Sequence, residues 1–331
     1  MKELPAILSE LLATDAKPSV LATLVHVEGS SYRRPGARLL VSARGHRVGS
    51  ISGGCLEEDA IARSREVLAT GNPEAVVYDT TSENDLVWGV GLGCHGVVQV
   101  LLEKLDPSLA WVGALAQNFR QRRATALAVT YGGEDRSLWG TRLAAPGDCH
   151  DPERLFLNLV PPPPALIIFG AGDDAQPLAR LAKELGWHIT VADVRAAFAT
   201  ASRFPQADAL HIAPPDALVE KVAPGRDALA VIMTHHYVHD LPLLRSLIGR
   251  PLRYLGLLGP RMRAEKMIGD LEREGQTIGA EQRARLHAPV GLDLGADSPE
   301  QVALAILAEM QAVLSGRNAQ SLRLRELPIH A

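Results

Sequence analysis

One strand–turn–helix segment in the second half of this sequence constrains the fold more than any other feature. Ala165–Phe169 is a short apolar run of the kind that forms a buried strand, and Gly170-Ala171-Gly172-Asp173-Asp174-Ala175 follows it directly. A helical pattern covers Ala175–Leu185, and a second strand is predicted at His188–Ala192, just before Asp193. A G-x-G-x-x-A turn between a strand and a helix is the fingerprint of a Rossmann unit.

Strands and helices continue to alternate beyond this unit. Further strands are predicted at Ala209–Ile212, Ala228–Met233 and Tyr254–Leu258, and Ser298-Pro299-Glu300-Gln301 is a capping box that begins a last helix. The helix after the last of these strands carries Arg261 and Arg263 in its first turn. Cations there oppose the helix dipole, so a bound anion or the acids of a neighbouring loop are expected to meet them. Alternation of this kind is typical of a parallel sheet. Residues 164–331 are therefore expected to form a Rossmann-like parallel-sheet domain.

The fingerprint turn is weaker evidence for nucleotide binding than for the fold. Gly170 and Gly172 would let the backbone approach a pyrophosphate, and Asp193 lies 23 residues past the first glycine, where an acid can bind a ribose hydroxyl. Asp173 and Asp174 would place negative charge against that pyrophosphate, although either could cap the helix instead. NAD(P) or another nucleotide is thus an alternative ligand of this domain.

Histidines gather after the strand Ala228–Met233, at the sheet edge where ligands of such domains bind. His235, His236 and His239 could hold a metal, or they could line a pocket and cap the following helix. Among them, His235 is a candidate binding residue.

The first half of the chain has a different character, and the length of 331 residues favours a second domain. Residues 1–105 are expected to form a mixed α+β domain and residues 106–163 to connect it to the Rossmann-like domain, ending in the stiff proline run 161–164. A net charge of −4 argues against a nucleic-acid partner, and charges near the start argue against a signal peptide or membrane span. A cytoplasmic protein with unpaired cysteines fits these features.

A glycine–cysteine motif is the strongest candidate site in the first half. Gly49–Glu58 reads GSISGGCLEE, so Ser52, Gly53 and Gly54 precede Cys55 at the expected first turn of a helix. There the free N–H groups and the helix dipole favour an anion such as a thiolate, but three acids that follow the cysteine oppose this effect. The alternative is a turn followed by a small buried thiol.

A loop rich in arginine and serine precedes this motif in the chain. Guanidinium forks suit phosphate or carboxylate oxygens, and serine and glycine can add further donors. A solvated basic loop explains the composition equally well, so both interpretations stay open. The candidate binding residues of this loop are Ser30, Ser31, Arg33, Arg34 and Arg38.

A second glycine–cysteine loop follows at Trp88–Gly96. Its four glycines exceed what one turn requires, and they suit close approach of the backbone to a ligand beside Gly93 and Cys94. The alternative is a glycine-rich bend before a strand at Val97–Leu102.

Taken together, these motifs resemble the xanthine dehydrogenase accessory factor family, also called the XdhC/CoxI family. The resemblance implies a chaperone that binds the molybdenum cofactor, supports its sulfuration by a cysteine desulfurase, and inserts it into an apo molybdenum hydroxylase of the xanthine dehydrogenase type. A homodimer is also expected. The residues that carry the resemblance are Glu28–Ser31, Arg34–Ala37, Gly49–Glu57, Gly91–Cys94, the Rossmann turn, Met233–His235 and Leu255–Arg261.

The chemistry of the candidate residues agrees with such a role. Soft sulfur from Cys55 or Cys94 could contact molybdenum, while the arginines could meet the cofactor's phosphate. The pattern shows no nucleophile–base–orienter triad, which favours a carrier over a hydrolase. Two alternatives are an NAD(P)-dependent oxidoreductase that uses Gly170, Gly172 and Asp193, and a Rossmann half that only senses a nucleotide or dimerises.

Overall fold

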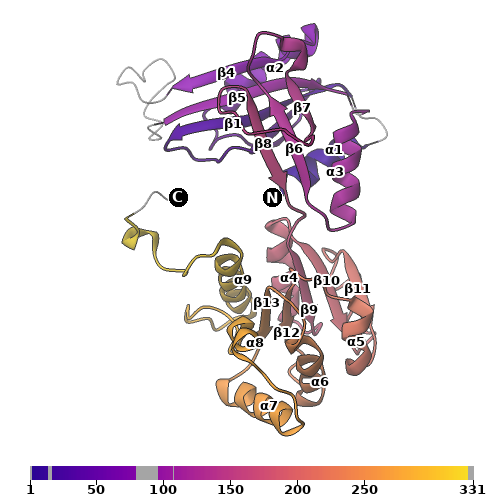
Figure 1. Ribbon diagram of the computed structural model, residues 1–331. Helices are drawn as coiled ribbons and strands as arrows, with labels where there is room; N and C mark the ends of the chain where they lie inside the picture. The colour runs from indigo at the N-terminus through magenta and orange to yellow at the C-terminus, as the bar shows by residue number, and fades with distance from the viewer. Residues whose placement is uncertain (1, 14–16, 80–95, 107, 327–331) are drawn as a thin grey trace. The chain divides into compact units, whose positions relative to one another are not determined.

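The computed structural model describes residues 2–13, 17–79, 96–106 and 108–326. The chain divides into two compact units, of which the first spans Met1–Pro162 and the second Pro163–Arg325 (Figure 1). The boundary thus falls inside the proline run 161–164.

The first unit combines helices with antiparallel sheets. Its elements are α1 (Glu3–Leu11), β1 (Ser19–Gly29), β2 (Arg38–Ser42), β3 (Arg47–Gly49), α2 (Glu57–Thr70), β4 (Glu74–Asp79), β5 (Gly96–Leu105), α3 (Ala110–Arg120), β6 (Thr125–Thr130), a 3-10 turn at Arg136–Leu138, β7 (Gly140–Leu143) and β8 (Leu155–Val160). Five strands form a sheet in the order β3-β2-β1-β5-β4, and three form a smaller sheet in the order β7-β6-β8. Every neighbouring pair in both sheets is antiparallel.

Helix α2 covers one face of the five-stranded sheet. Ala60 and Val67 of this helix pack against Ala22, Leu39 and Val100, which alternate along β1, β2 and β5 with residues of the opposite face. This packing fixes α2, and with it the loop that leads into the helix.

Residues 106–162 belong to the first unit and do not form a separate connector. Trp111 of α3 and Leu127 of β6 share a core with Leu21 and Leu40, which lie on the second face of the five-stranded sheet. The expected connecting segment 106–163 therefore supplies a helix and a sheet that bury apolar surface of the first domain.

The second unit is a six-stranded parallel sheet with helices on both faces. Its elements are β9 (Ala165–Phe169), α4 (Ala175–Glu184), β10 (His188–Asp193), β11 (Ala209–Ile212), α5 (Pro215–Val222), β12 (Leu229–Ile232), α6 (Tyr237–Ile248), β13 (Tyr254–Leu257), α7 (Arg261–Arg273), α8 (Ala280–Arg285), β14 (Leu286–His287), α9 (Pro299–Ser315) and a 3-10 turn at Leu322–Leu324. The strand order is β11-β10-β9-β12-β13-β14, and all neighbouring pairs are parallel. The predicted fold class, a mixed α+β domain followed by a Rossmann-like domain, is confirmed.

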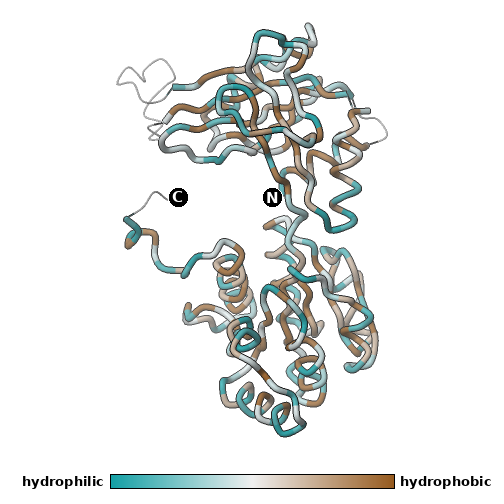
Figure 2. The backbone as a smooth tube through the Cα atoms, in the orientation of Figure 1, coloured by the Kyte–Doolittle hydropathy of each residue, from teal (hydrophilic) through white to brown (hydrophobic). Residues whose placement is uncertain are grey.

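Apolar side chains alternate between the two faces of the parallel sheet. Leu166 and Ile168 of β9 face the side covered by α4 and α9, whereas Ile167 and Phe169 face the side covered by α5, α6 and α7. Figure 2 shows hydrophobic residues along the central strands of this sheet. The strands are thus buried on both faces, as parallel strands require.

None of the helices in the described part of the chain has both the length and the apolar character needed to cross a lipid bilayer.

Candidate functional site

In the five-stranded sheet, β1 and β4 end at the level where β5 begins, beside two of the sequence motifs of the first unit. β1 ends at Gly29, which pairs with Gly96 at the start of β5, and β4 ends at Asp79, which pairs with Val97. β3 runs in the same direction as β1 and ends at Gly49, which lies level with Ala22, seven residues before the end of β1. We call Ser30–Ala37 the arginine loop and Ser50–Leu56 the cysteine loop.

Of the second glycine–cysteine loop, the structure describes Gly96, the first residue of β5. Gly93 and Cys94 lie outside the described residues, but Gly96 does not. A Cβ atom at Gly96 would lie 2.3 Å from the carbonyl oxygen of Ser30, so glycine is required where β5 begins beside the arginine loop. The strand that follows the second loop is therefore anchored against the first residue of the arginine loop.

The cysteine loop presents its tip to solvent and buries its ends. Gly53, Gly54 and Cys55 are exposed, whereas Ile51 and Leu56 are buried. Gly54 has a φ of +120°, a conformation that a residue with a side chain rarely adopts. Cys55 is thus a free, exposed thiol and not the buried residue of the alternative interpretation.

Helix α2 begins at Glu57, so Cys55 lies two residues before the helix and not in its first turn. The carboxylate of Glu57 holds the preceding part of the loop. Its Oε1 accepts hydrogen bonds from Ser50 Oγ at 2.8 Å, Ile51 N at 3.0 Å and Ser52 N at 2.8 Å, and its Oε2 accepts one from Ser52 Oγ. Burial alone would raise the pKa of Glu57, but the bonds from Ser52 and Ser50 outweigh it and lower the pKa.

The Ser52 hydroxyl links the Glu57 carboxylate to the two residues that flank Cys55. Ser52 Oγ accepts hydrogen bonds from the backbone N–H groups of Gly54 and Leu56, each at 3.1 Å. These are the residues on either side of Cys55. Sequence reasoning treated Glu57 only as a charge opposing a thiolate, because its partners become visible only when the loop is folded.

The arginine loop is tied to helix α1. Arg33 Nη1 donates to Glu3 Oε1 at 2.6 Å and Nη2 donates to Oε2 at 2.7 Å, which is a bidentate ion pair. The hydrogen bond to Glu3 raises the pKa of Arg33. Ser30 and Arg34 are exposed, and Ser31 is half-buried.

The arginine loop and the cysteine loop are neighbours. A Cβ atom at Gly53 would lie 3.6 Å from the ring of Tyr32, so the tip of one loop contacts a side chain of the other. Glu57 also contributes to the raised pKa of Arg33 through its charge. The structure thus brings the arginine loop and the cysteine loop together at Tyr32 and Gly53, which are separated in sequence.

Arg38 does not join this group. It is buried at 1% exposure, and its guanidinium donates to the Gly36 carbonyl and to Asn158 Oδ1, both at 3.0 Å. Burial lowers the pKa of Arg38 to about 10. The expectation that this side chain meets a phosphate from solvent is at odds with its position, since it fastens β2 to β8.

In the second unit, Gly170 serves the packing of two strands. Its φ is +121°, and a Cβ atom there would lie 2.5 Å from the carbonyl oxygen of Met233. The turns that follow β9 and β12 therefore touch. Strand order places this contact at the point where the chain switches from one half of the sheet to the other, which is where ligands bind in such folds.

The carboxylate of Asp193 already accepts hydrogen bonds from other residues of this chain. Its Oδ2 accepts from Ala171 N at 2.6 Å, and Arg195 donates to both oxygens, at 3.0 Å through Nε and 2.8 Å through Nη2. Burial would raise the pKa of Asp193, but the bonds from Arg195 and Ala171 outweigh it and lower the pKa. With 2% exposure, this carboxylate is not presented to a ribose as sequence reasoning expected.

Both acids of the fingerprint turn have basic partners. Asp173 accepts from Arg203 Nη2 at 2.8 Å, and Asp174 lies 2.7 Å from Nε2 of His235. Since an ionised carboxylate only accepts, Nε2 of His235 carries the proton of that bond. His235 also has a φ of +63°, which is uncommon for a residue with a side chain. Gly172 lies beside this pair, and a Cβ there would lie 2.6 Å from Asp174 Oδ1.

A buried network holds the backbone beside His235. Thr234 Oγ1 donates to Asp240 Oδ1 at 2.5 Å, and Arg263 Nη2 donates to Asp240 Oδ2 at 2.6 Å. The expectation that the two arginines of this turn meet an acid or an anion is thus met at Arg263, although Asp240 lies in α6 and not in a loop, whereas Arg261 is exposed. Asp240 itself was missed, because its sequence position within α6 gives no sign that it faces inward.

The histidine cluster does not assemble a metal site. His236 and His239 have ring centroids 5.4 Å apart, while His235 turns towards Asp174. Within the part of the chain that the structure describes, no group of three or more histidine, cysteine or acidic residues is placed to bind a metal ion.

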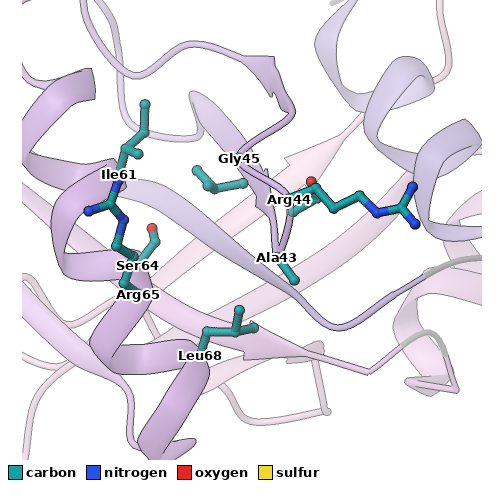
Figure 3. Close-up of a pocket in the computed structure, with 9 residues that line it drawn as sticks. Ala43, Arg44, Gly45, Ile61, Ser64, Arg65 and Leu68 are labelled. Carbon is teal, nitrogen blue, oxygen red and sulfur yellow. The ribbon is translucent and has the colours of Figure 1, made fainter.

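A hollow of about 220 Å³ lies elsewhere in the first unit, between the β2–β3 hairpin and α2. Arg44 of the hairpin and Arg65 of the helix line it, but their side chains extend in opposite directions (Figure 3). The hollow therefore does not gather two guanidinium groups around one ligand.

Comparisons with known proteins cover both units. Residues 166–310 match the family model of the XdhC Rossmann domain, and residues 12–79 match that of the XdhC and CoxI family. A Bacillus subtilis (strain 168) protein, named as a probable subunit of xanthine dehydrogenase, is 33% identical over 322 residues, which cover 91% of this chain and 94% of that protein.

Two further relatives extend this result. The Escherichia coli (strain K12) protein named molybdenum cofactor insertion chaperone PaoD is 26% identical, covering 90% of this chain and 84% of its own length. A crystal structure from Bacillus halodurans, described as a xanthine dehydrogenase, has a TM-score of 0.83 and 32% identity, and covers 97% of this chain and 98% of its own.

Proposed function

Because the chain belongs to the XdhC and CoxI family, we propose that it binds the molybdenum cofactor and inserts it into an apo molybdenum hydroxylase of the xanthine dehydrogenase type. The names of two relatives support this role, since one refers to xanthine dehydrogenase and the other to insertion of the cofactor. In this proposal the cofactor is cargo, and the chain is an accessory factor in the maturation of another enzyme.

One observation supports the assignment of this function to particular residues. Cys55 stands as an exposed thiol at the tip of a loop whose base is held by buried hydrogen bonds, and the arginine loop lies next to it. A thiolate is a soft ligand that suits a molybdenum centre bound by sulfur, and guanidinium groups suit the cofactor's phosphate. We assign the metal contact to Cys55, with Cys94 as a second contact, and the phosphate to Arg33 and Arg34.

The residues present fit such a cargo. Ser30, Ser31, Ser52, Gly53, Gly54 and Gly93 add hydroxyl and backbone groups to the same proposed site. Ser52 Oγ is engaged within the loop, so its contribution is to support the tip. We further propose that the bound cofactor is sulfurated here by a cysteine desulfurase, and that the protein acts as a cytoplasmic homodimer.

In the second unit, fewer groups are available to bind a ligand than the sequence predicted. Gly170 packs against Met233, and both oxygens of Asp193 accept hydrogen bonds from Arg195 or Ala171. Of the predicted binding residues of this unit, Gly172 and His235 are the two that could still meet a ligand. This arrangement does not favour the NAD-dependent form of the alternative oxidoreductase, in which a free acid binds the ribose 2′-hydroxyl. Titration with NAD and NADP distinguishes the two functions, because tight binding with turnover of a carbonyl substrate would support the oxidoreductase.

The proposed function is tested by looking for the cargo. The protein is purified from a host that makes the cofactor, and bound molybdopterin is oxidised to its fluorescent derivative and measured. We expect pterin to co-purify or to bind after anaerobic loading. Absence of pterin under both conditions would reject the proposal.

A further inference from the structure

The base of the cysteine loop is organised around one buried carboxylate. Glu57 is 5% exposed and receives hydrogen bonds from three successive residues, Ser50, Ile51 and Ser52. A buried carboxylate with this many donors is costly to replace, because each donor would lose its partner in a site that excludes water.

The constraint reaches Cys55 through two hydrogen bonds in series. Ser52 Oγ donates its proton to Glu57, which directs the remaining lone pairs of the hydroxyl towards the N–H groups of Gly54 and Leu56. Both neighbours of the cysteine are thus held by one oxygen. Without the carboxylate, the hydroxyl could rotate and these N–H bonds would no longer be fixed.

We propose that Glu57 is the positioning residue of Cys55, holding the exposed thiol in one place so that it meets its ligand without rearrangement of the loop. This inference rests on the proposed role of Cys55 in binding the cofactor, and it names the group that sets where the thiol stands. Glu57 does not touch the cargo itself, since its oxygens are filled by the loop.

Position and charge can be separated with a neighbouring residue. Glu58 carries the same charge one residue further along, but it is exposed and forms no hydrogen bond or ion pair with any described residue. If Glu57 acts by its charge, then neutralising Glu57 or Glu58 should change the reactivity of the Cys55 thiol to the same extent. If Glu57 acts by its hydrogen bonds, only changes at Glu57 should matter, even when the charge is kept.

The test measures the rate at which iodoacetamide alkylates Cys55 in the intact protein, relative to Cys149, by mass spectrometry of the peptides. Cys149 is a second exposed free thiol in the first unit and serves as the control within each sample. The variants are Glu57→Gln, Glu57→Asp and Glu58→Gln. The milder variant Ser50→Ala removes the hydroxyl that bonds both Glu57 and the Ser52 carbonyl, and it leaves the carboxylate in place.

We expect Glu57→Gln and Glu57→Asp each to change the Cys55 to Cys149 rate ratio by roughly threefold or more, the factor for losing one ordinary hydrogen bond. Glu58→Gln should leave the ratio unchanged, and Ser50→Ala should shift it in the same direction by less. The inference is overturned if Glu58→Gln matches Glu57→Gln while Glu57→Asp matches the wild type. It is also overturned if no Glu57 variant changes the ratio, or if the Glu57 variants fail to fold and Ser50→Ala has no effect.

This readout needs no cofactor, so it separates the two claims. Altered alkylation in a protein that never binds pterin would leave Glu57 as the positioning residue and reject the proposed function. Pterin binding that depends on Cys55, with alkylation insensitive to Glu57, would do the reverse.

Discussion

Glu3 and Arg33 form a two-point ion pair in which Nη1 of the guanidinium meets Oε1 of the carboxylate at 2.6 Å and Nη2 meets Oε2 at 2.7 Å. The same planar fork is the group that would bind a phosphate. Glu3 therefore occupies the fork of Arg33, and a phosphate bound by the same fork must displace Glu3. This competition links helix α1 to the arginine loop.

Replacement of Glu3 by glutamine should strengthen binding of the cargo's phosphate. We expect Glu3→Gln to raise the affinity for molybdopterin by roughly fivefold, since a partly exposed ion pair is worth about 1 kcal/mol. Glu10→Gln on the same helix is the matched control, because Glu10 pairs with His46 and not with the arginine loop. Equal or weaker binding by Glu3→Gln would show that Arg33 has only a structural role.

Substitution of Gly170 should destabilise the second unit through packing. In Gly170→Ala the new methyl group would lie 2.5 Å from the Met233 carbonyl oxygen, at a φ of +121°. We expect a loss of at least about 2 kcal/mol in the free energy of unfolding, measured by denaturant titration. Gly225→Ala is the control, as a Cβ there meets nothing within 4 Å. A neutral Gly170→Ala would contradict the close contact of the two turns.

Asp193 should contribute to stability in a pH-dependent way. Its folded pKa is lowered, so the stabilisation is fully present above the ordinary aspartate pKa of about 4 and is lost as the pH falls through the lower folded value. We expect Asp193→Asn to cost about 2 kcal/mol at pH 7, with the difference from wild type shrinking below about pH 4. The check is chemical denaturation at several pH values. A difference that stays constant with pH would reject the assigned role.

Features set by local sequence were predictable. The Rossmann turn, the capping box at Ser298 and the cation at the start of α7 all depend on a few adjacent residues, and the structure contains each of them. The family resemblance was visible in the sequence because its motifs are short and contiguous. The family models and the relative from Bacillus subtilis confirm it.

Features set by partners distant in sequence were not predictable. Arg38 looked like part of a basic loop, yet it bonds Asn158, 120 residues away. Asp193 had the spacing of a ribose ligand, but the backbone N–H of Ala171, 22 residues away, donates to one of its oxygens. Sequence spacing indicates which residues are near one another along the chain, but it does not indicate which hydrogen bonds a folded carboxylate has already made.

The cysteine loop combines features that were predictable from the sequence with one contact that was not. Its glycines and its thiol are evident in the sequence, and their exposure was one of two open interpretations. The organising contact, between Glu57 and the residues before the cysteine, depends on the turn that brings position 57 back against positions 50–52. That turn became visible only in the folded protein.

The most direct test of the account compares two single substitutions for their retention of cofactor. Cys55→Ala and Cys149→Ala each remove one exposed free thiol of the first unit. Both proteins are purified from the same cofactor-producing host, and bound pterin is measured per protein. We expect Cys55→Ala to retain much less pterin than the wild type, and Cys149→Ala to retain as much as the wild type. Equal retention by the two variants would contradict the assignment of the cargo site to the cysteine loop.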